Sequence, residues 1–213
     1  MKIIKPIFPV PTLEAIIDDY ENINKLLKIE LDKIFDSDAK RRVLSHKWGN
    51  YEFTNERTTF GYSNFDPLEP SSMSDDKNFK FFFDHIAQLI TEFFNELGYF
   101  DRWHFVNAWA AVYPKGAWVP LHDHVPLHWS GAYYVKTHKN CGNILFHDPK
   151  EYALSNEPED FMFRGKNKSA VEPQDGMLLL FPSYLKHETL PNQEDEDRII
   201  ISFNINCDKA PIR

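Results

Sequence analysis

The sequence predicts a mainly β fold, a sandwich or jelly roll, with helices confined to its N-terminal part. From Trp103 onward, short segments rich in β-branched and aromatic residues alternate with turn residues, which is the pattern of about eight strands in an all-β fold. Before residue 100, apolar residues recur at helical spacing instead. Because the 213 residues include 18 Phe but only 8 Gly, we expect an aromatic core.

The predicted strands are separated by Gly, Pro, Asn and Asp, and the last one follows an acidic turn at residues 194–197. They cover Trp103–Tyr113, Trp118–His124, Ser130–Lys136, Asn143–Phe146, Phe161–Arg164, Lys168–Glu172, Met177–Phe181, Leu185–Leu190 and Ile199–Ile205.

Two helices are predicted before these strands. The first starts near Leu13, after a Thr12 cap, and continues to Ile34; the second covers about Lys77–Leu97 and ends at Gly98. Residues 1–10 are expected to be extended, and residues 36–75 to form an irregular cover or lid. We expect one domain over 1–213, with a mostly helical part at 1–100 and a jelly-roll core at 101–208.

Composition excludes several functions. The net charge is −8 and no Lys/Arg-rich run exists, so nucleic acid is not an expected partner. The sequence has no stretch of about 18 apolar residues, so no transmembrane helix is expected. Its first residues lack the apolar run of a signal peptide. Cys141 and Cys207 lie far apart and form no C-x-x-C motif, so we expect a cytoplasmic location.

Three histidines have the spacing of a mononuclear metal site. His122 and His124 are separated by one residue, and His187 follows much later. In a β-strand, side chains at i and i+2 share a face, so His122 and His124 would point to one side and Asp123 to the other. Three protein ligands leave positions open for substrate or O₂. Imidazole suits Fe(II), Zn(II) and Ni(II), so the residues alone do not identify the metal.

The last predicted strand carries an arginine on one face. Arg198, Ile200, Ser202 and Asn204 alternate with four apolar residues. If the apolar face packs against helices, Arg198 points into the barrel, where its planar fork requires an anion such as a carboxylate. The alternative is a surface ion pair with the preceding acidic turn, and the pattern favours neither.

The C-terminal half, about residues 103–206, resembles the 2-oxoglutarate- and Fe(II)-dependent oxygenases. It is most similar to a group that shares the pattern H-x-H … SG-x-YY … FPS-x-x-x-H … R-x-x-x-SFN. The matching residues are His122-Asp123-His124, Ser130-Gly131-Ala132-Tyr133-Tyr134, Asp148-Pro149, Gly176, Phe181-Pro182-Ser183, His187, Arg198 and Ser202-Phe203-Asn204.

This resemblance implies a double-stranded β-helix with helices on its major sheet, and Fe(II), 2-oxoglutarate and O₂ as cofactors. It implies hydroxylation of a C–H bond while 2-oxoglutarate is decarboxylated to succinate, with no catalytic side chain beyond the metal ligands. Arg198 would bind the distal carboxylate of 2-oxoglutarate. The residues expected to complete that pocket are Tyr133 or Tyr134, Asn107 or Trp109, and Ser202.

The second metal position departs from the superfamily pattern. Relatives carry two histidines and one carboxylate, whereas the second position here is His124. We predict a site of His122, His124 and His187; the alternative is that a local bend brings Asp123 onto the metal.

Two other functions fit the same residues. One is a cupin-like metal dioxygenase that does not use 2-oxoglutarate, and the other is a jelly-roll binding module without catalysis. Arg198 distinguishes the 2-oxoglutarate-dependent enzyme from these alternatives, since without an anionic cosubstrate there is less reason for an inward-facing arginine. A small-molecule or peptidyl substrate is expected, and the sequence leaves the oligomeric state open, a homodimer included.

Overall fold

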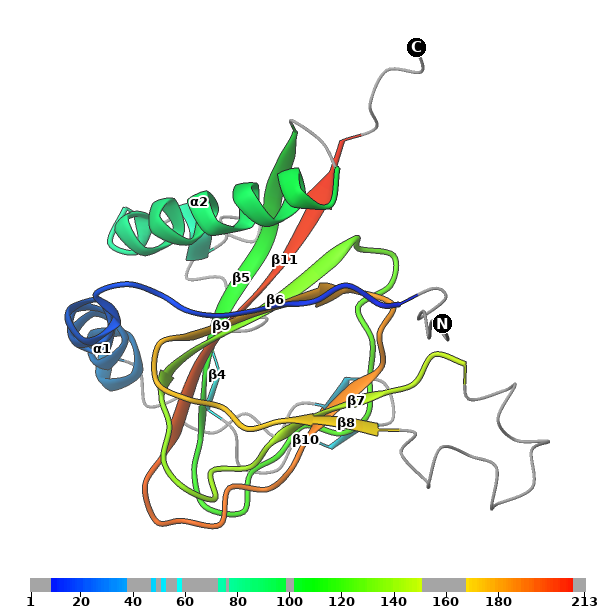
Figure 1. Cartoon of the computed structure of the whole chain (residues 1–213). Helices are drawn as coiled ribbons and strands as arrows, with labels where there is room; N and C mark the ends of the chain where they lie inside the picture. The colour runs from blue at the N-terminus through cyan, green and yellow to red at the C-terminus, as the bar shows by residue number, and fades with distance from the viewer. Residues whose placement is uncertain are drawn as a thin grey trace, which may run out of the picture.

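The computed structural model describes residues 9–37, 47–48, 51–52, 57–58, 73–75, 77–98, 102–150 and 168–208. A six-stranded and a three-stranded antiparallel sheet face each other, and two helices pack on the outer face of the larger sheet (Figure 1). The predicted mainly β class, with helices on one sheet, is confirmed.

The larger sheet has, in spatial order, β1 (Leu13–Ile16), β9 (Met177–Pro182), β6 (Trp129–Lys136), β11 (Arg198–Cys207), β5 (Trp103–Tyr113) and β4 (Arg57–Thr58). The smaller sheet has β10 (His187–Thr189), β7 (Ile144–His147) and β8 (Lys168–Val171), and β2 (Lys47–Trp48) pairs with β3 (Tyr51–Glu52).

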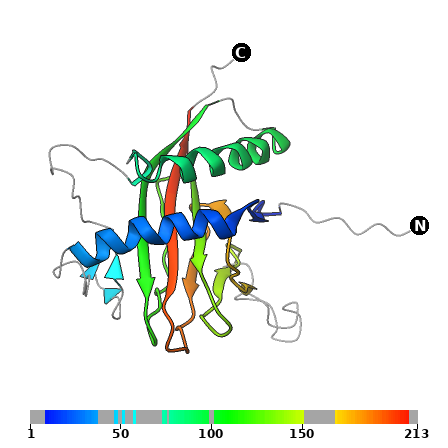
Figure 2. The ribbon, with the colours of Figure 1, turned by 90° about the vertical axis from the view of Figure 1, so that its left-hand side faces the viewer.

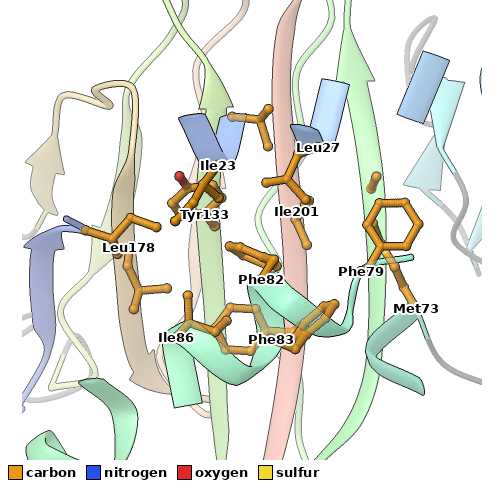
Figure 3. Packing of buried hydrophobic residues seen from close by; sticks show 14 of the residues in the cluster. Ile23, Leu27, Met73, Phe79, Phe82, Phe83, Ile86, Tyr133, Leu178 and Ile201 are labelled. Atoms are coloured by element: carbon orange, nitrogen blue, oxygen red, sulfur yellow. The ribbon is translucent and has the colours of Figure 1, made fainter. Parts of the chain in front are cut away.

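One face of the larger sheet is covered by α1 (Tyr20–Ser37) and α2 (Lys80–Glu96), which cross its strands in Figure 2. A single 3-10 turn, η2 (Met73–Asp75), precedes α2. Phe82 and Ile86 of α2 meet Ile201 and Leu178 of the sheet, with Leu27 of α1 beside them (Figure 3). Burial of this aromatic-rich layer holds the helices on the sheet.

The other face of the larger sheet looks into the space between the sheets. In β11, Ile199, Ile201, Phe203 and Ile205 pack in the helix-side core, whereas Ile200 packs in the core between the sheets. The alternation predicted for this strand is therefore confirmed. It places Arg198 and Asn204, both buried, on the interior side.

The predicted start of the first helix is wrong. Leu13–Ile16 forms β1, which pairs with β9 from Leu13↔Leu180 to Ile16↔Met177. Asp19 then adopts a positive φ of 55°, and α1 begins at Tyr20. The apolar spacing in this region fits a helix, but the free edge of β9 captures the segment as a strand. The second helix ends as predicted, since Gly98 follows it with φ 70°.

The strand predicted at Trp118–His124 is also wrong. This segment is irregular, and only His122 pairs, in an isolated antiparallel bridge with His187. Pro120 has no N–H to give to a ladder. The other predicted strands within the described residues are present, and β5 has the predicted bounds. The strand predicted at Phe161–Arg164, the extended residues 1–8 and most of the predicted cover at 36–75 lie outside the described residues.

None of the helices in the described ranges has the length and apolar character needed to cross a membrane.

Candidate metal centre and anion site

The three predicted histidines come together at one end of the space between the sheets. His122 and His187 exchange backbone hydrogen bonds of 3.0 and 2.9 Å, and the His124 N–H donates to Ser183 O at 2.9 Å. The His122 and His187 ring centroids are 4.2 Å apart, and the His124 ring lies 5.0 and 5.2 Å from them. One nitrogen from each ring lies within 4.8 Å of the others, a spacing that suits one shared metal ion.

The hydrogen bonds of the three rings determine which nitrogen is free. Nδ1 of His122 lies 2.8 Å from Pro120 O, and Nδ1 of His187 lies 2.9 Å from Leu185 O. Nδ1 of His124 lies 2.6 Å from Asn204 Oδ1. Carbonyl oxygens only accept, so each Nδ1 carries the proton and donates it. Each Nε2 is left with a free lone pair, as a metal ligand requires.

Burial keeps these imidazoles neutral. It lowers the pKa of His122 from 6.5 to about 4, with a further contribution from His124. Burial also lowers the pKa of His124, and it lowers the pKa of His187 well below 6.5 with help from the other two rings. Phe181 and Phe146 contribute to this environment, with ring centroids 4.7 and 6.0 Å from that of His187. At neutral pH, no proton competes with a metal ion for the three nitrogens.

Without metal, the protein is expected to lose stability as the pH falls from about 7 to 4. The folded-state pKa of His122 lies below its unfolded value, so the unfolded chain binds more protons in this window and the free energy of unfolding falls. Urea unfolding midpoints at several pH values measure the slope. His122→Asn should flatten it, whereas the same change at the exposed His104 should not. Equal slopes in all three proteins would contradict this account.

Asp123, the predicted alternative ligand, is not brought into the cluster. Its Oδ1 accepts a hydrogen bond from the Val125 N–H at 3.2 Å, which is a local turn contact. His128 also lies apart from the three rings, where its Nδ1 accepts from the Cys207 N–H. His147 contacts Glu188 at 3.0 Å.

Arg198 is buried, with 1% of its surface exposed. Its Nη1 donates to Cys141 O and Gly142 O, both at 2.8 Å, and its Nη2 donates to Thr189 Oγ1 at 3.3 Å. Its guanidinium carbon lies 4.5 Å from the centre of the Tyr113 ring. Nε has no hydrogen-bond partner. The alternative of a surface ion pair with Asp195 or Glu196 is not what the structure has, because Asp195 pairs with Lys115 at 2.9 Å and Glu196 pairs with Lys136 at 2.8 Å.

A buried cation of this kind calls for an anion. Thr189 connects Arg198 to the histidines, because it lies in β10 two residues after His187 and both side chains are buried. Two strand residues span roughly 6.6 Å. An elongated dianion could therefore reach from the metal position to the guanidinium.

The two candidate tyrosines lie on opposite faces of β6. Tyr134 belongs to the core between the sheets, and burial raises the pKa of its hydroxyl, which stays protonated and can donate to an anion. Tyr133 packs against Phe82 on the helix side, and its hydroxyl donates to Asn24 Oδ1 at 2.6 Å. Tyr133 therefore cannot line the interior, which corrects its candidacy as a cosubstrate residue.

The remaining predicted pocket residues lie nearer to the histidines. Asn107 accepts a hydrogen bond from Asn204 at 2.8 Å, and the Trp109 ring centre is 6.1 Å from that of His124. Ser202 pairs with Trp109 and Ala132, between Arg198 and Asn204 along β11. Thr189 and the Cys141 and Gly142 carbonyls were not predicted, since no residue pattern reveals which backbone oxygens will face a buried arginine.

A separate cavity of about 820 Å³ opens between β1, β8 and β9. Phe146, Phe181 and Leu185 form part of its lining, but none of the three histidines and not Arg198. The aromatic rings that contact His187 therefore stand between this cavity and the metal position.

Comparison with known proteins agrees with this geometry. Residues 107–204 match the family model described as "Putative 2OG-Fe(II) oxygenase". This segment includes the three histidines, Arg198 and Asn204. No curated protein sequence matches the chain.

Solved structures with low sequence identity share the fold. A prolyl-4-hydroxylase from Pseudomonas putida has 14% identity and a TM-score of 0.58, with 94% of each chain covered. HygX from Streptomyces hygroscopicus, solved with nickel and 2-oxoglutarate bound, has 14% identity and a TM-score of 0.59, covering 93% of this chain and 83% of HygX. AviO1 from Streptomyces viridochromogenes Tue57 has 11% identity and a TM-score of 0.60, covering 95% and 92%. The predicted double-stranded β-helix is confirmed.

Proposed function

We propose that this chain is a 2-oxoglutarate- and Fe(II)-dependent oxygenase, the family whose model residues 107–204 match, and that it hydroxylates a C–H bond of a small-molecule or peptidyl substrate. The structural relatives include a prolyl-4-hydroxylase and HygX with hygromycin B bound, which supports both substrate classes. The cofactors are Fe(II), 2-oxoglutarate and O₂.

We assign the Fe(II) ligands to His122, His124 and His187. The assignment is supported by three neutral rings with one nitrogen of each within 4.8 Å of the others, and by hydrogen bonds at each Nδ1 that leave Nε2 free. Three protein ligands leave coordination positions for a bidentate cosubstrate and O₂. Because no ligand carboxylate reduces the charge of the ion, the 2-oxoglutarate dianion has a stronger electrostatic role here than at a two-histidine, one-carboxylate site.

The observation that carries the proposal is Arg198, a buried guanidinium whose Nε has no hydrogen-bond partner and whose other nitrogens bind only uncharged oxygens, Cys141 O, Gly142 O and Thr189 Oγ1. We assign it to the distal carboxylate of 2-oxoglutarate, with Tyr134 and Thr189 beside it. A cupin-like enzyme without this cosubstrate would leave the buried charge unneutralised, which is a costly arrangement.

Bound Fe(II), with O₂ and 2-oxoglutarate, supplies the oxidation: 2-oxoglutarate becomes succinate and CO₂, one oxygen atom of O₂ enters succinate and the other enters the C–H bond. The chain itself holds the ligands neutral, anchors the anion and excludes water. Phe146 and Phe181 cover His187, which protects the reacting centre from solvent. No side chain has to act as a general base.

A succinate-release screen tests this function. Iron-loaded protein is supplied with 2-oxoglutarate, ¹⁸O₂ and candidate small molecules or peptides. We expect a substrate that raises succinate release and gains one ¹⁸O atom. Oxidation of a substrate without consumption of 2-oxoglutarate would point to the cupin-like alternative instead.

A further inference from the structure

The Nδ1–H group of His124 has a different kind of acceptor from those of the other two histidines. His122 and His187 donate Nδ1–H to the carbonyl two residues earlier in their own segments, Pro120 O and Leu185 O. His124 donates to a side chain 80 residues away, Asn204 of β11. His124 also lies in a loop outside any strand. Its ring is therefore oriented by side chains of the larger sheet, with Asn204 Oδ1 at 2.6 Å and Ser130 Oγ at 3.0 Å from Nδ1.

We propose that Asn204 is the positioning residue of His124, and that a row of polar side chains across the larger sheet fixes the direction in which its amide faces. This inference rests on the proposed function, because it takes His124 as a metal ligand. Asn204 does not touch the metal position; it acts through the imidazole.

The register of the sheet builds this row. Asn204 lies directly opposite Asn107 of β5 on one side and Ser130 of β6 on the other. Ser183 follows β9, whose Phe181 pairs with Ser130. Ser130, Ser183 and Asn204 are at most 3% exposed, so water cannot easily replace a lost hydrogen bond.

The hydrogen bonds of the row fit an amide that turns Asn204 Oδ1 toward His124. Asn204 Nδ2 donates to Asn107 Oδ1 at 2.8 Å, which turns Asn204 Oδ1 toward His124. Ser130 Oγ donates to the same Oδ1 at 2.8 Å and lies 3.0 Å from His124 Nδ1, and Ser183 Oγ lies 2.7 Å from Ser130 Oγ. If the amide were turned over, its NH₂ would face Nδ1, the proton of His124 would move to Nε2, and the metal ligand would be lost.

A β-bulge brings Asn107 into the row. Phe105 pairs with Ile205 and Asn107 pairs with Asn204, so Val106 is an extra residue without a partner. Phe105 packs on the helix side against Phe83, with ring centroids 5.1 Å apart. With regular alternation, Asn107 would share that face. The bulge instead turns Asn107 to the interior, where its oxygen meets the amide of Asn204.

Co(II) is a suitable probe, because it reports on histidine ligation through its visible spectrum and its affinity can be titrated without turnover. We expect Asn204→Ala to weaken Co(II) binding by roughly 10- to 100-fold, the usual cost of losing a partner that orients a metal-binding histidine. Asn204→Asp keeps an acceptor oxygen for His124 and should bind Co(II) with an affinity close to that of the unaltered protein. Asn206→Ala, a matched change in the same strand, should have no effect.

His124→Ala separates the two proposals. If His124→Ala lowers the affinity but Asn204→Ala does not, or if Asn204→Ala and Asn204→Asp lose it equally, the positioning role is wrong and the metal site stands. If His124→Ala binds Co(II) normally, the assignment of His124 itself is wrong. Unfolding midpoints without metal verify folding. Should Asn204→Ala not fold, Asn107→Ala is expected to bind several-fold more weakly than Asn107→Asp, and equal affinities would overturn the role.

Discussion

Replacing His187 by alanine is expected to abolish stable iron binding. The variant removes the most deeply buried of the three histidines and leaves two ligands on one loop. Since loss of even a histidine-orienting partner costs roughly 10- to 100-fold in affinity, loss of a ligand should cost more than about 100-fold. Iron content after anaerobic loading and desalting, with a competing chelator, measures the effect.

Two controls make this prediction specific to the assigned ligands. Asp123→Ala removes the carboxylate between His122 and His124, and His128→Ala removes a nearby histidine whose ring contacts the Cys207 N–H instead. Both variants should retain iron. Iron loss in Asp123→Ala with retention in His124→Ala would show that the carboxylate is the ligand.

Arg198→Ala is expected to raise the KM for 2-oxoglutarate by roughly 30-fold or more, because truncating one partner of a buried charge pair costs about 2–5 kcal/mol. Iron binding should be unaffected, since Arg198 is not a ligand. Arg198→Lys keeps the charge but loses the planar fork, so an intermediate KM is expected. Initial rates of succinate formation against 2-oxoglutarate concentration measure the change.

Arg198 also holds the chain at Cys141 and Gly142, so folding must be measured separately. Unfolding temperatures with iron, with and without 2-oxoglutarate, serve this purpose. The cosubstrate should stabilise the unaltered protein and not Arg198→Ala. A variant that folds normally and is still stabilised by 2-oxoglutarate would contradict the anchoring role.

Features that depend on a regular local period were predictable from the sequence. The alternation in β11 predicted that Arg198 shares a face with Asn204 and that Ile201 and Phe203 share the other, and the structure packs that second face against the helices. The bounds of β5 were predicted correctly. These strands are long, and one face of each is buried against helices, so period and tertiary structure agree.

Features set by pairing between distant segments were not predictable. Leu13–Ile16 has helical spacing but completes the edge of β9. The loop that carries His122 and His124 has β-type residues, yet Pro120 and the isolated bridge to His187 keep it irregular. Which of Tyr133 and Tyr134 faces the interior depends on the register of β6, and the sequence pattern does not determine that register.

The partners of the site depend on register, which no single-sequence pattern reveals. Asn204 was placed on the interior face, but its contacts with His124 and Asn107 follow from cross-strand pairing and from the bulge at Val106. Thr189 contacts Arg198 only because β10 of the smaller sheet lies close to the start of β11 in the larger sheet. Sequence therefore predicted the residues that face inward better than it predicted their neighbours.

The visible spectrum of the anaerobic Fe(II) protein with 2-oxoglutarate tests the central claim most directly, because it requires no substrate. A three-histidine Fe(II) site with Arg198 as the anion anchor predicts a weak charge-transfer band when 2-oxoglutarate is added. The band should be absent in His187→Ala and should require far more 2-oxoglutarate in Arg198→Ala. Protein that retains its iron but shows no band at saturating 2-oxoglutarate would contradict the account.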